Sequence, residues 1–93
     1  MSMDIEVIHN QPAQRFETRV EGELAVAAYR LDGQVMAMVH TEVPAALEGR
    51  GIASRLVQAA FDHAQAQGLK IRPLCSYVAA WARRHPERAA LLA

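Results

Sequence analysis

The feature that most constrains the fold of this sequence is a strand, a helix and a second strand predicted in succession in its second half. Residues 34–43 are apolar on both faces, which is typical of a central strand covered on two sides. Residues 52–67 place apolar side chains at i, i+3 and i+4 spacing, as an amphipathic helix does, and Gly68 is the expected C-terminal stop. Residues 70–74 form a short strand, in which Pro73 favours an edge, a bulge or a splay. Such a unit folds as a right-handed crossover between parallel strands.

Shorter elements precede and follow this unit. Polar and apolar residues alternate over three earlier runs, and Asp32-Gly33 after the third run is a hairpin signal. Residues 77–84 predict a second helix, and Pro86 suits the first position of a third. The sequence therefore predicts an α+β domain, with an antiparallel meander of about four strands followed by helix, strand and helix. The three earlier strands are predicted at 4–8, 15–20 and 24–30, with a turn at 9–12.

A glycine-rich loop, Gly49-Arg50-Gly51-Ile52-Ala53, joins the apolar strand to the helix. A glycine-rich turn that leads into a helix leaves backbone N–H groups unpaired at the positive end of the helix dipole. Such a helix start binds phosphate or pyrophosphate. The alternative is an ordinary loop with a glycine cap. In an open sheet, a loop at the carboxyl end of a parallel strand is also where ligands bind.

Length and composition bound the class of protein. Ninety-three residues make one domain, residues 1–93. A single cysteine excludes an intramolecular disulfide and a four-cysteine metal site, and it suits a reducing compartment. No apolar run approaches the roughly 20 residues that span a bilayer, and the N-terminal residues lack the basic region of a secretory signal. We therefore expect a cytoplasmic protein without membrane contacts, and no metal site because the histidines are scattered.

Charge is distributed unevenly although the net charge is zero. Residues 1–48 carry three basic and eight acidic side chains, whereas residues 49–93 carry seven basic and two acidic ones. A polyanionic small molecule that docks at the glycine loop fits this asymmetry, and so does a weak nucleic-acid surface. Chance fluctuation in a short chain explains it equally well. No run of Lys and Arg and no aromatic ladder supports nucleic-acid binding.

The segment Glu48-Gly49-Arg50-Gly51-Ile52-Ala53 resembles the acyl-CoA pyrophosphate loop of the GCN5-related N-acetyltransferases, whose pattern is Gln/Arg-x-x-Gly-x-Gly/Ala. Gly51 and Ala53 match the last two fixed positions, whereas Glu48 stands where the family has Gln or Arg. A carboxylate beside a pyrophosphate is unfavourable unless it points away, so Glu48 receives no binding role. The whole chain resembles the small, single-cysteine subfamily of these proteins, through the loop and the motifs at 40–44, 73–77 and 85–87.

The resemblance implies a minimal acyl-CoA N-acyltransferase fold, in which the pantetheine arm of acetyl-CoA lies between two splayed parallel strands. It also implies transfer of an acetyl group from acetyl-CoA, or coenzyme A, to an amine acceptor. Larger relatives carry two helices between their first two strands, and these build much of the acceptor site. Here only residues 9–14 separate the strands, so the sequence does not identify the acceptor.

Coenzyme A binding is assigned mainly to the loop. Backbone donors of residues 50–53 can cradle the pyrophosphate, and glycine is needed where the backbone approaches the ligand. The side chains of Arg50, Arg55 and Arg84 can meet further phosphate charge. The predicted cofactor-binding residues are Val43, Gly49, Arg50, Gly51, Ile52, Ala53, Ser54 and Arg84.

Cys75 and His40 are the candidate catalytic residues, because each ends a strand beside the presumed thioester. Cys75 can take the acetyl group and pass it on, or it can protonate the departing coenzyme thiolate; a helix that starts at Ser76 favours its anion. As a neutral imidazole, His40 can accept a proton from the amine or set the protonation of Cys75. The alternatives are a small buried cysteine and a structurally satisfied histidine. Tyr77 can act as a general acid, but aromatic packing is the favoured role.

Three functional classes remain open from the sequence. The first is the acetyltransferase, and the second is a coenzyme A-binding module or sensor without efficient catalysis, which the absent acceptor-site helices favour. The third is a nucleic-acid binder, which predicts steeply salt-dependent binding. We expect a monomer or a weak homodimer.

Overall fold

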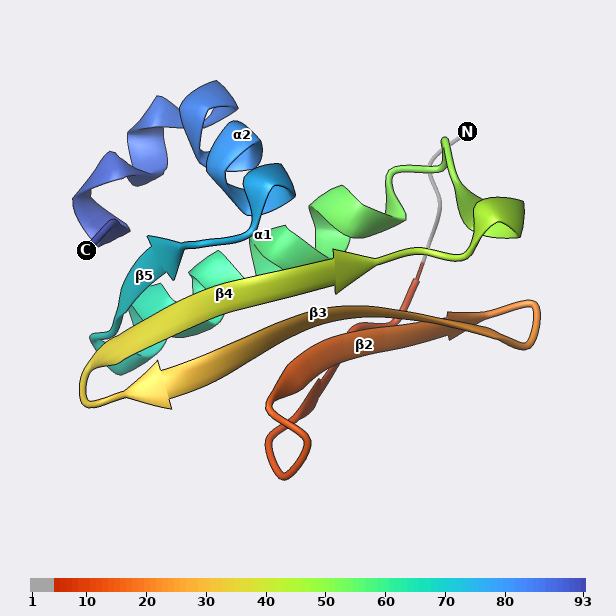
Figure 1. Cartoon of the computed structure of the whole chain (residues 1–93), viewed down its shortest axis with the longest axis horizontal. Helices are drawn as coiled ribbons and strands as arrows, with labels where there is room; N and C mark the ends of the chain where they lie inside the picture. The colour runs from red at the N-terminus through yellow and green to blue at the C-terminus, as the bar shows by residue number, and fades with distance from the viewer. Residues whose placement is uncertain (1–4) are drawn as a thin grey trace.

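The computed structural model describes residues 5–93, which form one sheet and the helices packed against it (Figure 1). The sheet has five strands in the order β1-β2-β3-β4-β5. Two α-helices and two short 3₁₀ helices complete the fold. The elements are β1 (Ile8–Asn10), β2 (Arg15–Val20), β3 (Glu23–Asp32), β4 (Val35–Glu42), η1 (Ala45–Leu47), α1 (Ile52–Gln67), β5 (Lys70–Pro73), α2 (Ser76–Arg84) and η2 (Pro86–Leu91).

The predicted topology is confirmed. Strands β1 to β4 form an antiparallel meander, and β4 pairs with β5 in parallel through the α1 crossover. Strand β5 lies at the edge of the sheet, as Pro73 predicts, because proline has no N–H group for a further partner.

The first strand differs from the prediction. It covers Ile8–Asn10 rather than 4–8, and the turn that was predicted at 9–12 lies at 11–14. Residue 4 lies outside the described residues. Aromatic packing accounts for the shift, because His9 pairs with Phe16 across the strands and their rings stack with centroids 4.2 Å apart. The His63 ring on α1 also contacts the His9 ring, edge-on, with centroids 4.3 Å apart.

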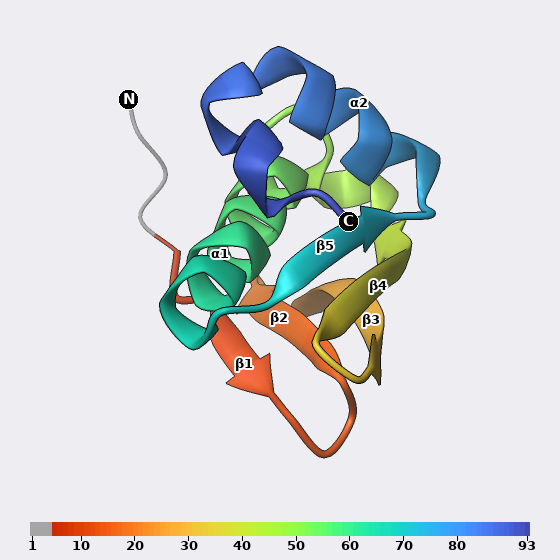
Figure 2. The same cartoon turned by 90° about the vertical axis from the view of Figure 1, so that its left-hand side faces the viewer.

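Helix α1 covers the core face of the sheet (Figure 2). Its inward face is fully buried, with side chains that include Leu56, Ala60 and Phe61. They pack against buried residues of the strands, among them Phe16 and Met38. Both ends of α1 follow the sequence prediction: Gly51 and Gly68 adopt left-handed conformations, and the Leu69 N–H donates to the Ala64 carbonyl at 2.8 Å. No helix of residues 5–93 has the length and apolar character needed to cross a membrane.

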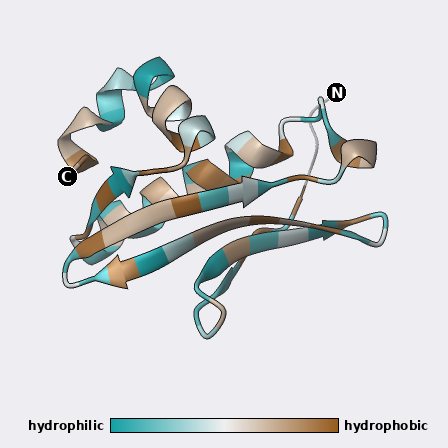
Figure 3. Ribbon diagram, in the orientation of Figure 1, coloured by the Kyte–Doolittle hydropathy of each residue, from teal (hydrophilic) through white to brown (hydrophobic). Residues whose placement is uncertain are grey.

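Strand β4 is hydrophobic along most of its length (Figure 3). Met36 and Met38 are fully buried and Ala37 is 7% exposed, so the centre of the strand is covered on both faces. Val35 and Val39 are half-buried. The prediction of a strand covered on two sides therefore holds only for the middle of β4.

The second helix completes the layer beside α1. The rings of Phe61 and Trp81 lie 4.8 Å apart, and the Trp81 indole N–H donates to Ser54 Oγ at 2.9 Å. The predicted third helix begins at Pro86 but is a 3₁₀ helix, and Arg88 ties it to Asp62 on α1. These contacts hold α2 and the 3₁₀ helix that follows it against α1.

Candidate active site

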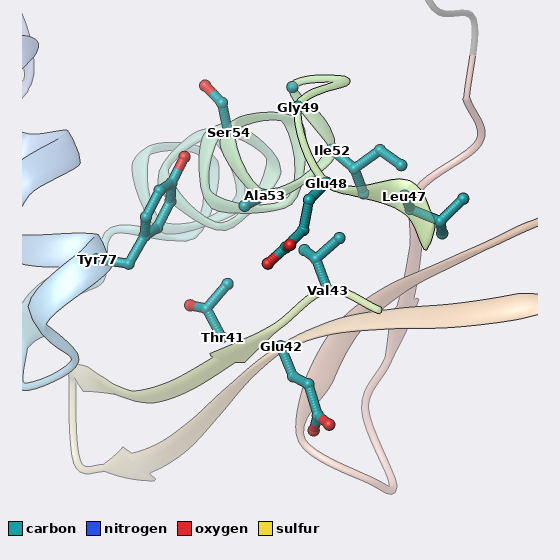
Figure 4. A pocket seen from close by; sticks show the side chains of 11 residues that line it. Thr41, Glu42, Val43, Leu47, Glu48, Gly49, Ile52, Ala53, Ser54 and Tyr77 are labelled. Atoms are coloured by element: carbon teal, nitrogen blue, oxygen red, sulfur yellow. The ribbon is translucent and has the colours of Figure 1, made fainter. Parts of the chain in front are cut away.

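A cavity of about 550 Å³ opens where β4 ends, between the glycine loop and the starts of α1 and α2 (Figure 4). Its wall is formed by backbone of the loop and by side chains of β4 and α2. The residues that line it are Thr41, Glu42, Val43, Leu47, Glu48, Gly49, Gly51, Ile52, Ala53, Ser54 and Tyr77.

A β-bulge in β4 decides which side chains face this cavity. Ala28 pairs with His40 while Tyr29 pairs with Met38, so Val39 is an extra residue on β4. Successive residues of a strand point to opposite faces, and one extra residue therefore reverses the alternation. Beyond the bulge, the odd-numbered residues of β4 face the core side.

Thr41 is the residue that the bulge turns inward. It lies opposite Ala27, which is fully buried in the core. Figure 4 shows the Thr41 side chain pointing toward the cavity and the Glu42 side chain pointing away from it. The bulge therefore brings a hydroxyl group to the cavity wall.

His40 is placed on the opposite face. Its side chain is 60% exposed, and its Nε2 lies 3.3 Å from a carboxylate oxygen of Glu42. Because Glu42 points away from the cavity and shares a face with His40, the structure does not bring the His40 ring to the other predicted catalytic residue, Cys75.

Strands β4 and β5 separate next to the cavity. Their last paired residues are Met38 and Pro73, and after them the Cys75 N–H donates to the Met38 carbonyl at 2.9 Å. The predicted splay at Pro73 is thus present. Beyond Met38, β5 no longer pairs with the edge of β4 that it faces.

Cys75 lies at the N-terminus of α2, half-buried, within reach of the cavity wall. Its Sγ donates to Thr41 Oγ1 at 3.5 Å. Burial raises the pKa of the thiol, but hydrogen bonds to the Thr41 side chain and to backbone groups of Val78, Tyr77 and Thr41 outweigh it, so the pKa is lower than usual. The structure therefore favours the thiolate form more than an ordinary cysteine does.

The glycine loop presents backbone donors to the cavity. Gly51 precedes α1 in a left-handed conformation, with φ of 78°, and no side chain caps the helix start. The first intrahelical bond of this turn runs from the Arg55 N–H to the Gly51 carbonyl at 3.1 Å. The N–H groups of residues 52–54 therefore have no acceptor within the helix. These are the free backbone donors that the sequence predicts at this helix start.

Of the predicted cofactor-binding residues, six line the cavity and two do not. The six are Val43, Gly49, Gly51, Ile52, Ala53 and Ser54. Ser54 also accepts the Trp81 hydrogen bond, so its hydroxyl helps to hold α1 against α2. Arg50 turns outward and pairs with Glu21 of the β2–β3 turn at 2.9 Å. Arg84 lies exposed in the last turn of α2.

Glu48 and Thr41 are residues of the site whose orientation sequence reasoning missed. Figure 4 shows the Glu48 side chain pointing into the cavity rather than away from it. The sequence does set Glu48 apart, because it stands where the family pattern has Gln or Arg. Nothing in the sequence indicates the orientation of Thr41. In an unbroken strand the side chains of Met38 and Thr41 would point to opposite faces of the sheet. Among residues 5–93, no group of three or more His, Cys, Asp or Glu side chains is arranged to hold a metal ion.

Comparisons with known sequences and structures find relatives of this chain and of its fold. The sequence profile of a family described as GCN5-related N-acetyl-transferase matches residues 15–91. Protein NATD1 of Xenopus tropicalis is 35% identical over 88 residues, which cover 91% of this chain and 81% of that protein. Protein NATD1 of Homo sapiens is also 35% identical, over 88% of this chain and 75% of that protein. The NMR solution structure of a GCN5-like protein from Staphylococcus aureus superposes with a TM-score of 0.76 at 24% identity, covering 95% of this chain and 87% of that one.

Proposed function

The chain belongs to the GCN5-related N-acetyltransferase family, and we propose that it binds acetyl-CoA in the cavity beside β4 and transfers the acetyl group to an amine. The family membership supports acyl transfer from acetyl-CoA as the class of reaction. The assignment of this cavity as the binding site, and of individual residues to roles within it, is our proposal.

One observation supports the proposal most directly: the N-terminus of α1, which no side chain caps, borders an open cavity. The N–H groups of residues 52–54 lie at the positive end of the α1 dipole, where a pyrophosphate is stabilised. A Cβ atom on Gly51 would meet no protein atom within 4 Å, so the backbone there is open to a ligand. The volume of about 550 Å³ lies in the usual range of small-molecule sites, ~300–1,000 Å³. The donor set and the space both fit coenzyme A.

The splayed strands supply a place for the thioester. In the proposed complex the pantetheine arm lies along the edge of β4 that β5 leaves unpaired after Met38. Backbone N–H groups of this edge, up to Val43, then donate to the thioester carbonyl oxygen, whose negative charge grows as the amine attacks. Donors fixed in advance stabilise such charge strongly.

Cys75 is the proposed proton donor. Attack of the neutral amine on the carbonyl carbon forms the C–N bond and breaks the C–S bond, and the electron pair of that bond leaves on the coenzyme sulfur. The proton of Cys75 Sγ passes to this sulfur, and the thiolate that remains is stabilised by the hydrogen bonds that lower its pKa. The acylated nitrogen then gives up its surplus proton to the Cys75 thiolate, which leaves a neutral amide and restores the thiol. A general acid of this kind contributes ~10²–10⁴-fold to a rate.

Two measurements test the proposal. Isothermal titration with acetyl-CoA and with coenzyme A measures binding, and release of free coenzyme thiol in the presence of a panel of primary amines measures transfer. We expect a saturable site and amine-dependent thiol release, which Cys75→Ala reduces. Absence of binding at millimolar acetyl-CoA would refute the proposal. Tight binding with no turnover of any amine would instead identify a coenzyme A-binding module.

Mass spectrometry after mixing with acetyl-CoA separates the two roles of Cys75. A general acid leaves the protein mass unchanged. An acetyl adduct that disappears in Cys75→Ala would show that Cys75 carries the acetyl group between the cofactor and the amine.

A further inference from the structure

We infer that Thr41 is a positioning residue for Cys75: its hydroxyl holds the thiol at the cavity wall in both of its protonation states. The inference rests on the proposed function only for the role of Cys75. The contact between the two residues stands on the structure alone, because Cys75 Sγ donates to Thr41 Oγ1 at 3.5 Å.

The backbone around both residues fixes this contact. The Cys75 N–H donates to the Met38 carbonyl of the same strand that carries Thr41, and the Cys75 carbonyl accepts the Ala79 N–H at 3.0 Å. On the other side, the bulge at Val39 turns Thr41 inward, opposite the buried Ala27. Main-chain bonds therefore hold the backbone at both residues, so the two side chains meet without a further cost of ordering the backbone.

The chemistry of a hydroxyl suits both forms of the thiol. A hydroxyl has one donor and two acceptor sites and rotates to suit its partner. It accepts from the neutral Cys75 S–H and, after the proton has passed to the departing coenzyme sulfur, it donates to the Cys75 thiolate. The backbone groups of Val78, Tyr77 and Thr41 lower the pKa of the thiol, so they stabilise the thiolate. Thr41 is therefore the partner that keeps the sulfur in one place throughout proton transfer.

Thr41→Val is the discriminating variant, because it removes the hydroxyl and keeps the β-branched shape that suits a strand. The far-ultraviolet absorbance of the thiolate, titrated against pH with Cys75→Ala as the blank, reports the ionisation of Cys75 without any reagent entering the site. Thr41→Ser restores the hydroxyl. Ser76→Ala, an exposed neighbour of Cys75, is the matched control for a small change near the thiol.

We expect the Thr41→Val titration to move to higher pH. The hydroxyl binds the thiolate more strongly than the neutral thiol, and only this difference moves the titration, so the thiolate-to-thiol ratio at a given pH should fall about fivefold. Thr41→Ser should titrate close to the wild type, and Ser76→Ala should not move. In the transfer assay, kcat should fall in Thr41→Val and recover in Thr41→Ser, since the hydroxyl acts on the thiol.

Identical titrations of the wild type and Thr41→Val, with both proteins folded by circular dichroism, would overturn the inference. If Thr41→Val does not fold, Thr41→Ala gives the same test, since it also lacks the hydroxyl. The titration needs no cofactor. Failure to bind acetyl-CoA would therefore refute the proposed function, and the titration would still report whether Thr41 acts on Cys75. Normal acetyl-CoA binding with an unshifted titration refutes only the role of Thr41.

Discussion

Replacing Gly51 by alanine separates the conformational role of the glycine loop from its role in binding. Gly51 has φ of 78°, where an L-residue costs ~1–2 kcal/mol. No protein atom lies within 4 Å of the Cβ that alanine would add, so strain of the backbone is the whole expected cost in the free protein. For a domain of this size, 1 kcal/mol lowers Tm by ~4–8 °C.

Gly68→Ala is the matched control. Gly68 ends the same helix, with φ of 71° and the same open surroundings, but it does not line the cavity. Both variants should therefore lose similar stability in thermal and urea unfolding. Only Gly51→Ala should also weaken acetyl-CoA binding, because its new methyl group projects into the space that the pyrophosphate needs and disturbs the N–H groups of the helix start.

The comparison is made by isothermal titration with acetyl-CoA, well below the Tm of either variant. We expect at least a tenfold loss of affinity for Gly51→Ala, or about 1.4 kcal/mol, and wild-type affinity for Gly68→Ala. Wild-type affinity in a folded Gly51→Ala protein would refute the argument that this loop holds the cofactor. Equal losses in the two variants would show that affinity follows stability and not the loop.

Three further predictions concern charge and packing. Glu48→Gln should raise the affinity for acetyl-CoA, more at low than at high ionic strength, because it removes a carboxylate that points into the cavity; Glu42→Gln, whose side chain points away, should change it little in the same titration. Burial and the charge of a neighbouring histidine lower the pKa of His9 below its usual 6.5, so the folded state prefers the neutral ring. Its contribution to the free energy of unfolding is therefore complete above pH 6.5 and is lost as the pH falls through the folded-state pKa, and urea unfolding across this range should show a slope that His9→Gln reduces. Trp81→Phe removes the indole donor to Ser54 and truncates a ring that is 2% exposed, so its cost in urea unfolding should exceed the ~1 kcal/mol of the hydrogen bond, and a double-mutant cycle against Ser54→Ala should isolate the bond as the non-additive part.

The fold could be predicted where local signals agree. The apolar period of α1, the glycines at its two ends and the crossover rule placed the helix, its caps and the parallel pairing of β4 with β5. The first strand could not be placed, because its position depends on the stacking of His9 on Phe16 and on the contact of His9 with His63. These are contacts between segments far apart in the sequence, and alternation within one short run carries no information about them.

The site could be predicted at the level of the backbone but not of every side chain. The free N–H groups follow from the glycine loop and the helix start, which are local features. The outward turn of Arg50 depends on Glu21, 29 residues earlier in the chain, so a basic residue in the loop could not be assigned to phosphate from its position alone. The faces to which His40 and Thr41 point depend on the β-bulge, and no sequence pattern predicts that bulge.

Three departures from regular structure lie within a few residues of the lining of one cavity, and their coincidence is an argument for a ligand. The bulge at Val39 disrupts the β3–β4 ladder, Pro73 ends the β4–β5 pairing, and Gly51 holds a left-handed turn without a side-chain cap. Each departure leaves polar backbone groups without a regular partner, which lowers stability unless something else satisfies them. Packing alone gives no reason for the three to converge, whereas a ligand with a phosphate end and a carbonyl end uses all of them: the loop for the phosphate, the unpaired strand edge for the carbonyl, and the bulge to set Thr41 against Cys75.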